Sequence, residues 1–295
     1  MSNTATVLAF DFGASSGRAI RAVYDGQNLT YEEIHRFENV PIEKGGHLCW
    51  DVETLLKEIH TAIQKAGTFD SLGFDTWGVD FGLLDADGHL LANPVHYRDA
   101  RTNGKPEQAA ARMPAEELYA HTGNQIMAIN TLFQLLALRE QDPELLQKAE
   151  QILFMPDLFA ALLGAEPVCE RSIASTSQML DPRTGQWSRE VLTAYSLKEN
   201  HFAPLVASGT VTGTLTTGAK IIAVAGHDTQ CASAAMPCAE EDAEHTAFLS
   251  CGTWSLLGTE LDTPILTADS CQSGLSNELG ANGKINYLKN IIGLW

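Results

Sequence analysis

The beginning of the chain alternates short apolar runs with tight polar turns. Residues 7–10 and 19–24 are mostly apolar and flank a segment that holds two glycines and two serines. This pattern predicts two strands joined by a tight turn. A further turn at residues 25–26 and a run over residues 29–37 predict a third strand. The chain is therefore expected to start with an antiparallel meander rather than a strand–helix–strand unit.

The clearest helix is predicted over residues 51–66, where apolar side chains recur at helical spacing and form one face. Asp51 is suited to cap its N-terminus, and Gly67 fits the position just after its C-terminus. A strand is expected next, at residues 71–75. Strands and helices thus mix along the chain, which predicts an α/β fold. The G-x-G-x-x-G motif is absent, and Lys105 is followed by proline rather than Ser or Thr, so neither dinucleotide-binding nor P-loop proteins fit.

The middle of the chain is mainly helical in pattern, with proline or polar residues between the segments. Helices are predicted at residues 106–111, 115–121, 131–140, 143–149 and 156–163. The hydroxyl-rich residues 172–177 are expected to form a loop, and residues 181–185 a turn. A buried strand over residues 221–225 then leads into a small-residue helix at 231–235.

The last part of the chain repeats the opening hairpin in outline. Residues 246–250 and 254–258 predict strands on either side of a Gly-containing turn, and irregular sequence follows. The repeat suggests two domains, at residues 1–243 and 244–295. The acidic stretch over residues 239–244 would link them.

Composition narrows the function classes. The 295 residues are 44% hydrophobic and carry a formal net charge of −18, which disfavours nucleic acid and anionic membranes as partners. No apolar run is long enough to span a membrane, and the N-terminus lacks the pattern of a signal peptide. The six cysteines include no Cys-x-x-Cys pair, so we expect reduced thiols in a cytoplasmic protein.

The turn between the first two strands has the chemistry of a phosphate site. Several backbone N–H groups and two hydroxyls would share one small space, an arrangement that suits anions. Asp11 ends the first strand, where a carboxylate can hold hydrated magnesium, and Arg18 adds a fixed positive charge. The same pattern is also typical of an ordinary Gly-Ser hairpin.

Two further clusters are candidates for ligand binding. Asp75, Trp77 and Asp80 lie close together at a strand end and could line a polyol pocket, or they could form a turn around a core tryptophan. His227 and Asp228 lie where a strand changes to a helix, a position at which α/β proteins bind ligands. An Asp there is also the usual residue for capping a helix.

Taken together, these segments resemble the FGGY carbohydrate kinases, which belong to the actin–hexokinase–Hsp70 superfamily. The resemblance spans the whole chain, and the segments that carry it are residues 11–18, 34–37, 75–81, 97–99, 101–104, 155–157, 227–229, 250–256 and 288–295. It implies an actin-like, ribonuclease H-like ATPase fold of two similar domains around a deep cleft, with the first domain complete and the second only begun. Members of the family continue well beyond Trp295.

The resemblance also implies a reaction and its residues. Within the family it points to phosphoryl transfer from ATP to the 1-hydroxyl of L-rhamnulose, with Asp228 as the general base and Asp11 serving Mg²⁺. The implied contacts to the ATP phosphates are Ala14, Ser15, Ser16, Gly17, Arg18 and Thr253. The implied contacts to the sugar are Gly78, His227, Asp228, Thr229 and Asn290.

Three alternatives stay open at this point. One is an FGGY kinase for another ketose or polyol, such as fuculose or xylulose. Another is an Hsp70- or actin-like protein that uses the nucleotide for switching. The third is an inactive fragment that binds sugar only, because the part of the family that supplies most of the adenosine pocket has no counterpart here. We expect residues 1–295 alone not to turn over ATP at a useful rate.

Overall fold

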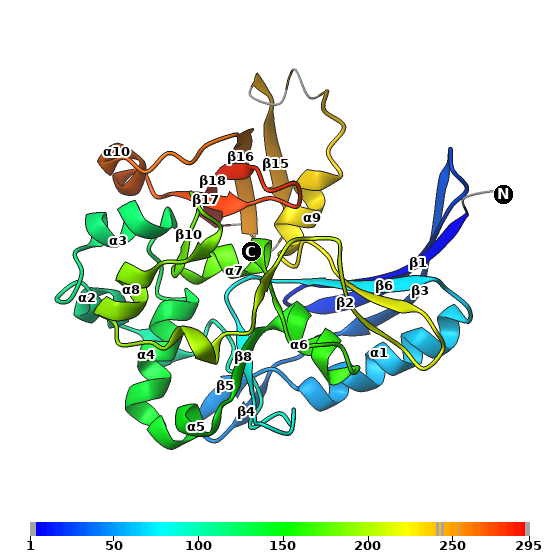
Figure 1. Cartoon of the computed structure of the whole chain (residues 1–295), viewed down its shortest axis with the longest axis horizontal. Coiled ribbons are helices and arrows are strands. Elements are labelled where there is room, and N and C mark those ends of the chain that lie inside the picture. The colour runs from blue at the N-terminus through cyan, green and yellow to red at the C-terminus, as the bar shows by residue number, and fades with distance from the viewer. Residues whose placement is uncertain (1–3, 240–241, 243–244, 253, 293–295) are drawn as a thin grey trace.

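A six-stranded mixed sheet forms the centre of the molecule in the computed structural model, which describes residues 4–239, 242, 245–252 and 254–292. Its strand order is β13-β14-β6-β1-β2-β3. The strands are β1 (Ala5–Phe12), β2 (Ser16–Tyr24), β3 (Leu29–Glu38), β6 (Ser71–Thr76), β13 (Thr210–Thr214) and β14 (Lys220–Ala223). Figure 1 shows this sheet to one side and a second, smaller sheet above the helical part of the chain.

The order and direction of the strands confirm the predicted start of the chain. β1, β2 and β3 are antiparallel neighbours. After a crossover through α1 (Val52–Ala66), β6 lies parallel to β1 on its other side, and β14 lies parallel to β6. The C-terminal ends of the three parallel strands meet at one edge of the sheet, so the residues that follow them come together.

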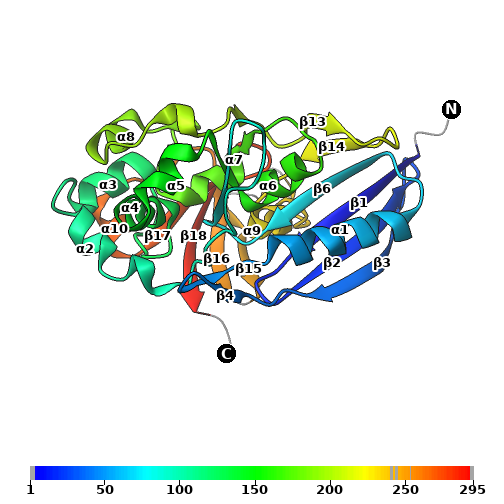
Figure 2. The same cartoon turned by 90° about the horizontal axis from the view of Figure 1, so that it is seen from below.

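Helix α1 is amphipathic as predicted and covers one face of the main sheet (Figure 2). Asp51 caps it, because its side chain accepts a hydrogen bond from the Thr54 backbone N–H. Val52, Leu55 and Ile59 are buried in the same apolar cluster as the strand residues. On the sheet, the rings of Phe10 and Phe74 stack with their centroids 4.8 Å apart. Burial of this apolar surface drives the packing.

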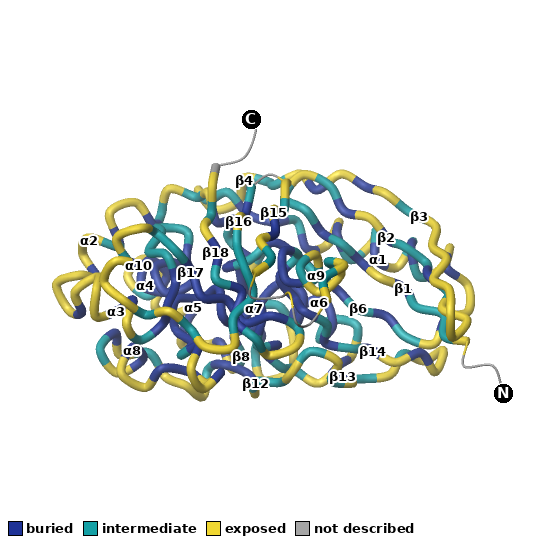
Figure 3. The backbone as a smooth tube through the Cα atoms, turned by 90° about the horizontal axis from the view of Figure 1, so that it is seen from above, coloured by how far each residue is buried: buried dark blue, intermediate teal, exposed yellow. Residues whose placement is uncertain are grey.

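The helical predictions for the middle of the chain are confirmed. The predicted helices are α2 (Lys105–Ala109), α3 (Ala115–Thr122), α4 (Thr131–Gln141), α5 (Pro143–Lys148) and α6 (Met155–Leu162). The helix α8 (Arg189–Ala194) and the short 3₁₀ turns η1 (Ala100–Thr102) and η3 (Glu199–His201) were not predicted. Small two-stranded sheets join them: β4 (Ile42–Lys44) with β5 (His47–Cys49), β7 (Phe81–Leu84) with β8 (Gln151–Phe154), β9 (Cys169–Glu170) with β12 (Leu205–Val206), and β10 (Leu180–Asp181) with β11 (Gln186–Trp187). Figure 3 shows the buried residues concentrated in the middle of the molecule.

The prediction of a loop at residues 172–177 is wrong. This segment forms α7 (Arg171–Ala174) and the 3₁₀ turn η2 (Ser175–Ser177), and its residues are buried. The cause is Glu170, whose carboxylate accepts hydrogen bonds from the backbone N–H groups of Ser172 and Ile173. A side chain that caps a helix end in this way satisfies donors that would otherwise lack partners.

The C-terminal part is more regular than predicted. The hairpin of β15 (Ala247–Cys251) and β16 (Trp254–Leu261) is confirmed, but the sequence after it forms α10 (Ala268–Gln272), β17 (Leu275–Leu279) and β18 (Ile285–Ile292) rather than irregular structure. The four strands make an antiparallel sheet in the order β15-β16-β18-β17. The predicted linker falls partly outside the described residues. Among the helices that the structure describes, none has the length and apolar character needed to cross a membrane.

Candidate functional site

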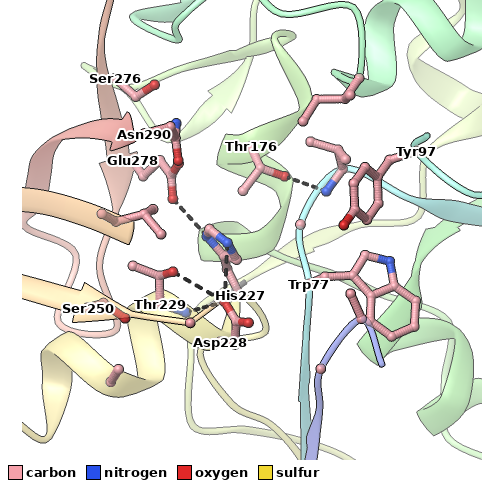
Figure 4. A pocket seen from close by; sticks show the side chains of 18 of the residues that line it. Trp77, Tyr97, Thr176, His227, Asp228, Thr229, Ser250, Ser276, Glu278 and Asn290 are labelled. Atoms are coloured by element: carbon pink, nitrogen blue, oxygen red, sulfur yellow. Dashed lines mark hydrogen bonds and ion pairs between the residues drawn. The ribbon is translucent and has the colours of Figure 1, made fainter. Parts of the chain in front are cut away.

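A pocket of about 440 Å³ lies between the edge of the main sheet and the second sheet. Figure 4 shows Trp77 and Tyr97 on one side, His227 and Asp228 in the centre, and Glu278 and Asn290 opposite. The pocket brings together most residues predicted for the site: Asp11, Ala14, Ser15, Ser16, Arg18, Gly78, His227, Asp228, Thr229 and Asn290. Gly17 is not among the lining residues, and Thr253 lies outside the described residues.

The predicted phosphate turn forms one end of this pocket. The turn between β1 and β2 is closed by a hydrogen bond of 2.9 Å from the Gly13 N–H to the Ser16 carbonyl. Gly17 lies behind the turn, where an added Cβ would come within 2.3 Å of the Phe37 ring. The structure therefore gives Gly17 a packing role, and its contact with phosphate stays a prediction.

Arg18 is held in the pocket by Asp11, which lies opposite it across β1 and β2. The Arg18 Nη2 and Nε atoms lie 2.6 and 2.8 Å from Asp11 Oδ2. Both side chains remain partly exposed, at 45% and 31%. The guanidinium and the carboxylate expected to serve a metal are thus already paired, so a phosphate–magnesium ligand would meet both charges at one place.

The surroundings of Asp11 fit a divalent cation. Asp11 lies next to Asp75 in the register of β1 and β6. Burial first, and then the charges of Asp11 and Asp228, raise the pKa of Asp75 well above its ordinary value. Three carboxyl groups, those of Asp11, Asp75 and Asp228, therefore lie near one another at this edge of the sheet, and hard cations such as Mg²⁺ prefer carboxylate oxygens.

The other end of the pocket has an aromatic wall. Trp77 and Tyr97 line it, but Asp75 and Asp80 are not among the lining residues, so the prediction that both carboxylates face a polyol is wrong. Asp80 lies behind the wall and is 1% exposed. It accepts hydrogen bonds from the indoles of Trp50 and Trp77, the Tyr97 backbone N–H and the Gln134 side chain. Burial nevertheless raises the pKa of Asp80 to about 6.

Val79, beside the same wall, has an unusual backbone conformation. Its φ is 67°, in the left-handed region that β-branched residues rarely adopt. Its N–H donates to the Thr176 hydroxyl at 3.1 Å, and its carbonyl accepts from the Thr131 hydroxyl at 2.6 Å. Strained residues held by surrounding hydrogen bonds are often found at functional sites.

Asp228 opens on the middle of the pocket. It is the first residue of α9 (Asp228–Ala234), and His227 occupies the capping position, so Asp228 is not the N-cap. The strand leading to it is fixed at Gly226, whose carbonyl accepts from the Thr76 N–H at 2.9 Å. The Asp228 side chain remains 42% exposed. Burial raises its pKa, and the nearby His227 opposes that shift.

Sequence reasoning found Asn290 on β18 but missed Ser276 and Glu278, which the second sheet also contributes to the pocket. Glu278 on β17 lies 2.8 Å from His227 Nδ1. Ser276 on the same strand accepts from the Gln125 N–H at 3.0 Å, and the Gln125 side chain reaches Asn290 on β18 at 3.4 Å. No local signal in the sequence pointed to Glu278, because it lies in a polar segment without strand periodicity.

The pocket thus joins a turn that carries serine hydroxyls and the Arg18 guanidinium to a partly exposed carboxylate and an aromatic wall. A carboxylate placed in this way can accept a proton from a hydroxyl, while the turn holds a charged group. Aromatic faces pack against the C–H groups of sugars and other polyols. The arrangement is suited to group transfer between an anionic donor and a hydroxylated acceptor.

Comparisons with known proteins agree with this chemistry. Residues 6–234 match the N-terminal domain of the FGGY family of carbohydrate kinases. The chain is 42% identical over 301 residues to a rhamnulokinase of Bacteroides thetaiotaomicron and 39% identical over 298 residues to one of Enterobacter sp.. Each alignment covers 98% of this chain, but the chain spans only 61% and 60% of the two relatives.

Solved structures show the same fold. A crystal structure of a xylulose kinase from Brucella ovis superposes with a TM-score of 0.81 at 20% identity, covering 99% of this chain and 61% of that one. The glycerol kinase of Plasmodium falciparum superposes with a TM-score of 0.75 at 16% identity, covering 97% of this chain and 60% of that one. The fold is therefore that of the actin-like sugar kinases. By its sequence match over residues 6–234, the chain belongs to the FGGY family of carbohydrate kinases.

Proposed function

We propose that the protein transfers the γ-phosphoryl group of ATP to the 1-hydroxyl of L-rhamnulose. The observation that carries this proposal is the Asp228 carboxylate, which opens on the same pocket as the turn between β1 and β2. The substrate is proposed from the two relatives named rhamnulokinase, which resemble this chain along nearly its whole length.

Asp228 has the role of general base in this proposal. The sugar 1-oxygen forms a bond to the γ-phosphorus as the bond from that phosphorus to the ADP oxygen breaks, and the hydroxyl proton passes to Asp228. An alcohol is a weak nucleophile, so a carboxylate within hydrogen-bonding reach of its proton assists the attack. Asp228 is suited to this because its exposed edge faces the pocket.

The turn at residues 14–18 would hold the phosphates. Its backbone N–H groups, the hydroxyls of Ser15 and Ser16 and the Arg18 guanidinium are all donors toward an anion. Asp11 would hold a magnesium ion, which neutralises phosphate charge when bound. Positioning and electrostatic stabilisation contribute most of the catalysis in phosphoryl transfer. Thr253 is proposed as a further phosphate contact from the family resemblance.

The sugar would lie between the aromatic wall and α9. Gly78 leaves room for it, because an added Cβ there would lie 3.4 Å from His227 Nε2 and 3.3 Å from the Thr176 side chain. His227, Thr229 and Asn290 line the same space and can exchange hydrogen bonds with hydroxyl groups. Trp77 would pack on the C–H face of the sugar.

Two general properties complete the proposal. The six cysteines are free, which is typical of proteins in the reducing cytoplasm, and we place the protein there. The net charge of −18 makes nucleic acid and anionic membranes unsuitable partners. We also propose that residues 1–243 and 244–295 belong to two different domains of the family fold.

The test is a substrate panel with ATP and Mg²⁺. ADP release is measured with L-rhamnulose, L-fuculose, D-xylulose and glycerol. Both the 295-residue chain and the same chain continued by the remaining sequence of the Bacteroides relative are assayed. L-rhamnulose is expected to give the highest kcat/KM. If another acceptor gives a kcat/KM about tenfold higher, that acceptor would replace L-rhamnulose as the proposed substrate. ATP turnover that does not depend on sugar would favour a nucleotide switch.

A further inference from the structure

His227 lies between two carboxylates that come from different parts of the chain. Its Nδ1 atom is 2.8 Å from Glu278 Oε2 on β17, and its Nε2 atom is 3.4 Å from Asp228 Oδ1 on α9. The His227 side chain is 11% exposed and the Glu278 side chain 5%. Figure 4 shows the imidazole with one edge toward each acid. The three residues form a continuous series that crosses from the second sheet to the centre of the pocket.

This geometry favours one protonation state of the imidazole. A neutral imidazole has one N–H and one bare lone pair, so one of its nitrogens would face a carboxylate without a proton between them. The imidazolium has an N–H on both sides and can meet both acids. The hydrogen bond from Nδ1 to Glu278 and the short distance from Nε2 to Asp228 therefore both favour the doubly protonated ring.

The charges around the ring favour the same state. Burial acts most strongly and lowers the pKa of His227, but Glu278, then Asp228 and Asp75, more than offset it and raise that pKa to about 9. These acids come from β17, α9 and β6. The uncharged Gly78 lies on the Nε2 side, where an added Cβ would be 3.4 Å from that atom, and the Glu170 carboxylate accepts from the N–H of Gly226, the residue before His227. Glu278 contributes the closest and largest of the favourable charges.

Glu278 is itself held in place by amide side chains. Gln230 on α9 donates to Glu278 Oε2 at 2.8 Å. Asn286 on β18 donates to the Gln230 side-chain oxygen and, at 2.9 Å, to the Ser233 hydroxyl. Glu278 is 4% exposed and Asn286 1%. Moving a buried carboxylate away from fixed donors and a charged partner costs free energy, so the position of Glu278 is well defined.

We infer that Glu278 is a positioning residue that keeps His227 doubly protonated and, through it, keeps Asp228 ionised as a base. The inference rests on the proposed function only for the role of Asp228. The contact between Glu278 and His227 stands on geometry without it. Burial and, to a smaller extent, the charge of Asp11 raise the pKa of Asp228, while the His227 charge and then the hydrogen bonds from Thr229 lower it. Loss of the His227 charge would therefore leave the base protonated to a higher pH. The second sheet thereby sets the pH range in which a residue of α9 can accept a proton.

The first test follows the His227 ring by NMR in the 295-residue chain, without sugar or ATP. Its signal is assigned by its absence in His227→Asn. In the wild type the ring is expected to stay protonated up to about pH 9, and in Glu278→Gln its pKa should fall by about two units or more. Glu278→Asp keeps the charge and should retain most of the elevation. Glu260→Gln makes the same change on the same sheet outside the pocket and should leave His227 unchanged.

The second test is the pH dependence of kcat/KM for the acceptor found in the substrate panel. Glu278→Gln should move the acid limb of the profile to higher pH by about one unit, with a smaller change at high pH. A wild-type His227 that titrates below about pH 7 would overturn the inference without any variant. An unchanged titration in Glu278→Gln would overturn it as well. If no acceptor is phosphorylated, the proposed function fails, while the NMR test still decides on Glu278.

Discussion

The Trp77 indole N–H donates a hydrogen bond of 3.0 Å to the carboxylate of Asp80, so an aromatic residue of the pocket wall is fixed from behind by a buried charge. The same oxygen accepts from Trp50 at 2.7 Å, and the two indole rings lie with their centroids 3.9 Å apart. A change at Asp80 should therefore affect both stability and the shape of the pocket.

The first prediction concerns the pH dependence of this stabilisation. The folded protein holds the Asp80 proton up to about pH 6, whereas the reference pKa is 3.8. The folded state thus binds the proton more tightly, and this contribution to stability is full below pH 3.8 and lost as the pH rises through about 6. We expect the difference in unfolding free energy between the wild type and Asp80→Asn to shrink by about 3 kcal/mol over that window.

Urea denaturation at several pH values measures this difference. Asp87→Asn, in the exposed turn after β7, is the matched control. Its unfolding free energy should differ from that of the wild type by a constant amount at every pH. A difference between wild type and Asp80→Asn that stays constant across the window would show that Asp80 does not hold its proton in the folded state.

The second prediction concerns the base. Asp228→Asn keeps the shape of the side chain and removes its capacity to accept a proton. In a form of the protein that is active in the substrate panel, kcat should fall by roughly 10²–10⁴-fold, while sugar affinity measured by calorimetry changes little. Asp87→Asn again serves as the control and should keep wild-type kcat. Near wild-type turnover in Asp228→Asn would rule out this role.

The third prediction concerns Glu170, which ties the base-bearing segment to α7. Its Oε2 accepts from Ser172, Ile173 and the Gly226 N–H, and its Oε1 accepts from the Ser208 hydroxyl. Glu170→Ala leaves these donors buried without partners and should cost about 3–5 kcal/mol of unfolding free energy. Ser208→Ala removes a single hydrogen bond and should cost about 1 kcal/mol. Urea denaturation measures both unfolding free energies. Equal decreases in the two variants would contradict the prediction that Glu170 stabilises several buried donors at once.

The fourth prediction concerns room for the sugar. Gly78 has no left-handed backbone, so Gly78→Ala should fold with a melting temperature within about 3 °C of the wild type. Its new methyl group would press on His227 and Thr176, so the KM for the sugar should rise about tenfold or more. The KM for ATP is the internal control and should stay constant. A parallel rise in both constants would show that the effect is not local to the sugar.

Much of the main sheet and the helical part could be predicted because the information is local. In α1, Val52, Leu55 and Ile59 recur at helical spacing, and Asp51 lies at the capping position. The hairpin around Gly13 carries its turn residues in the sequence itself. Its phosphate chemistry, together with His227 and Asp228, could be proposed for the same reason.

The rest depends on partners that are remote in the chain. Glu278, Asn277 and Asn286 are buried although polar, so β17 and β18 do not show the alternation expected of strands. Glu278 finds its partner His227 51 residues earlier. Aspartate is a common ligand-binding residue type, but the Asp80 carboxylate accepts hydrogen bonds from four donors in the interior of the protein. Hydrophobic pattern cannot distinguish such satisfied interior charges from functional ones.

The place of β14 in the main sheet has a consequence for how the protein is made. β14 pairs with β6, Lys220 opposite Ser71, so the last parallel strand joins a sheet begun much earlier in synthesis. Pairings between distant segments form slowly. A nascent chain in which the first hairpin and α1 have folded would already display the phosphate turn, but Asp228, which follows β14, would not yet lie beside it. In a form of the protein that is active in the substrate panel, recovery of turnover during refolding should therefore lag behind recovery of secondary structure and report the docking of this strand.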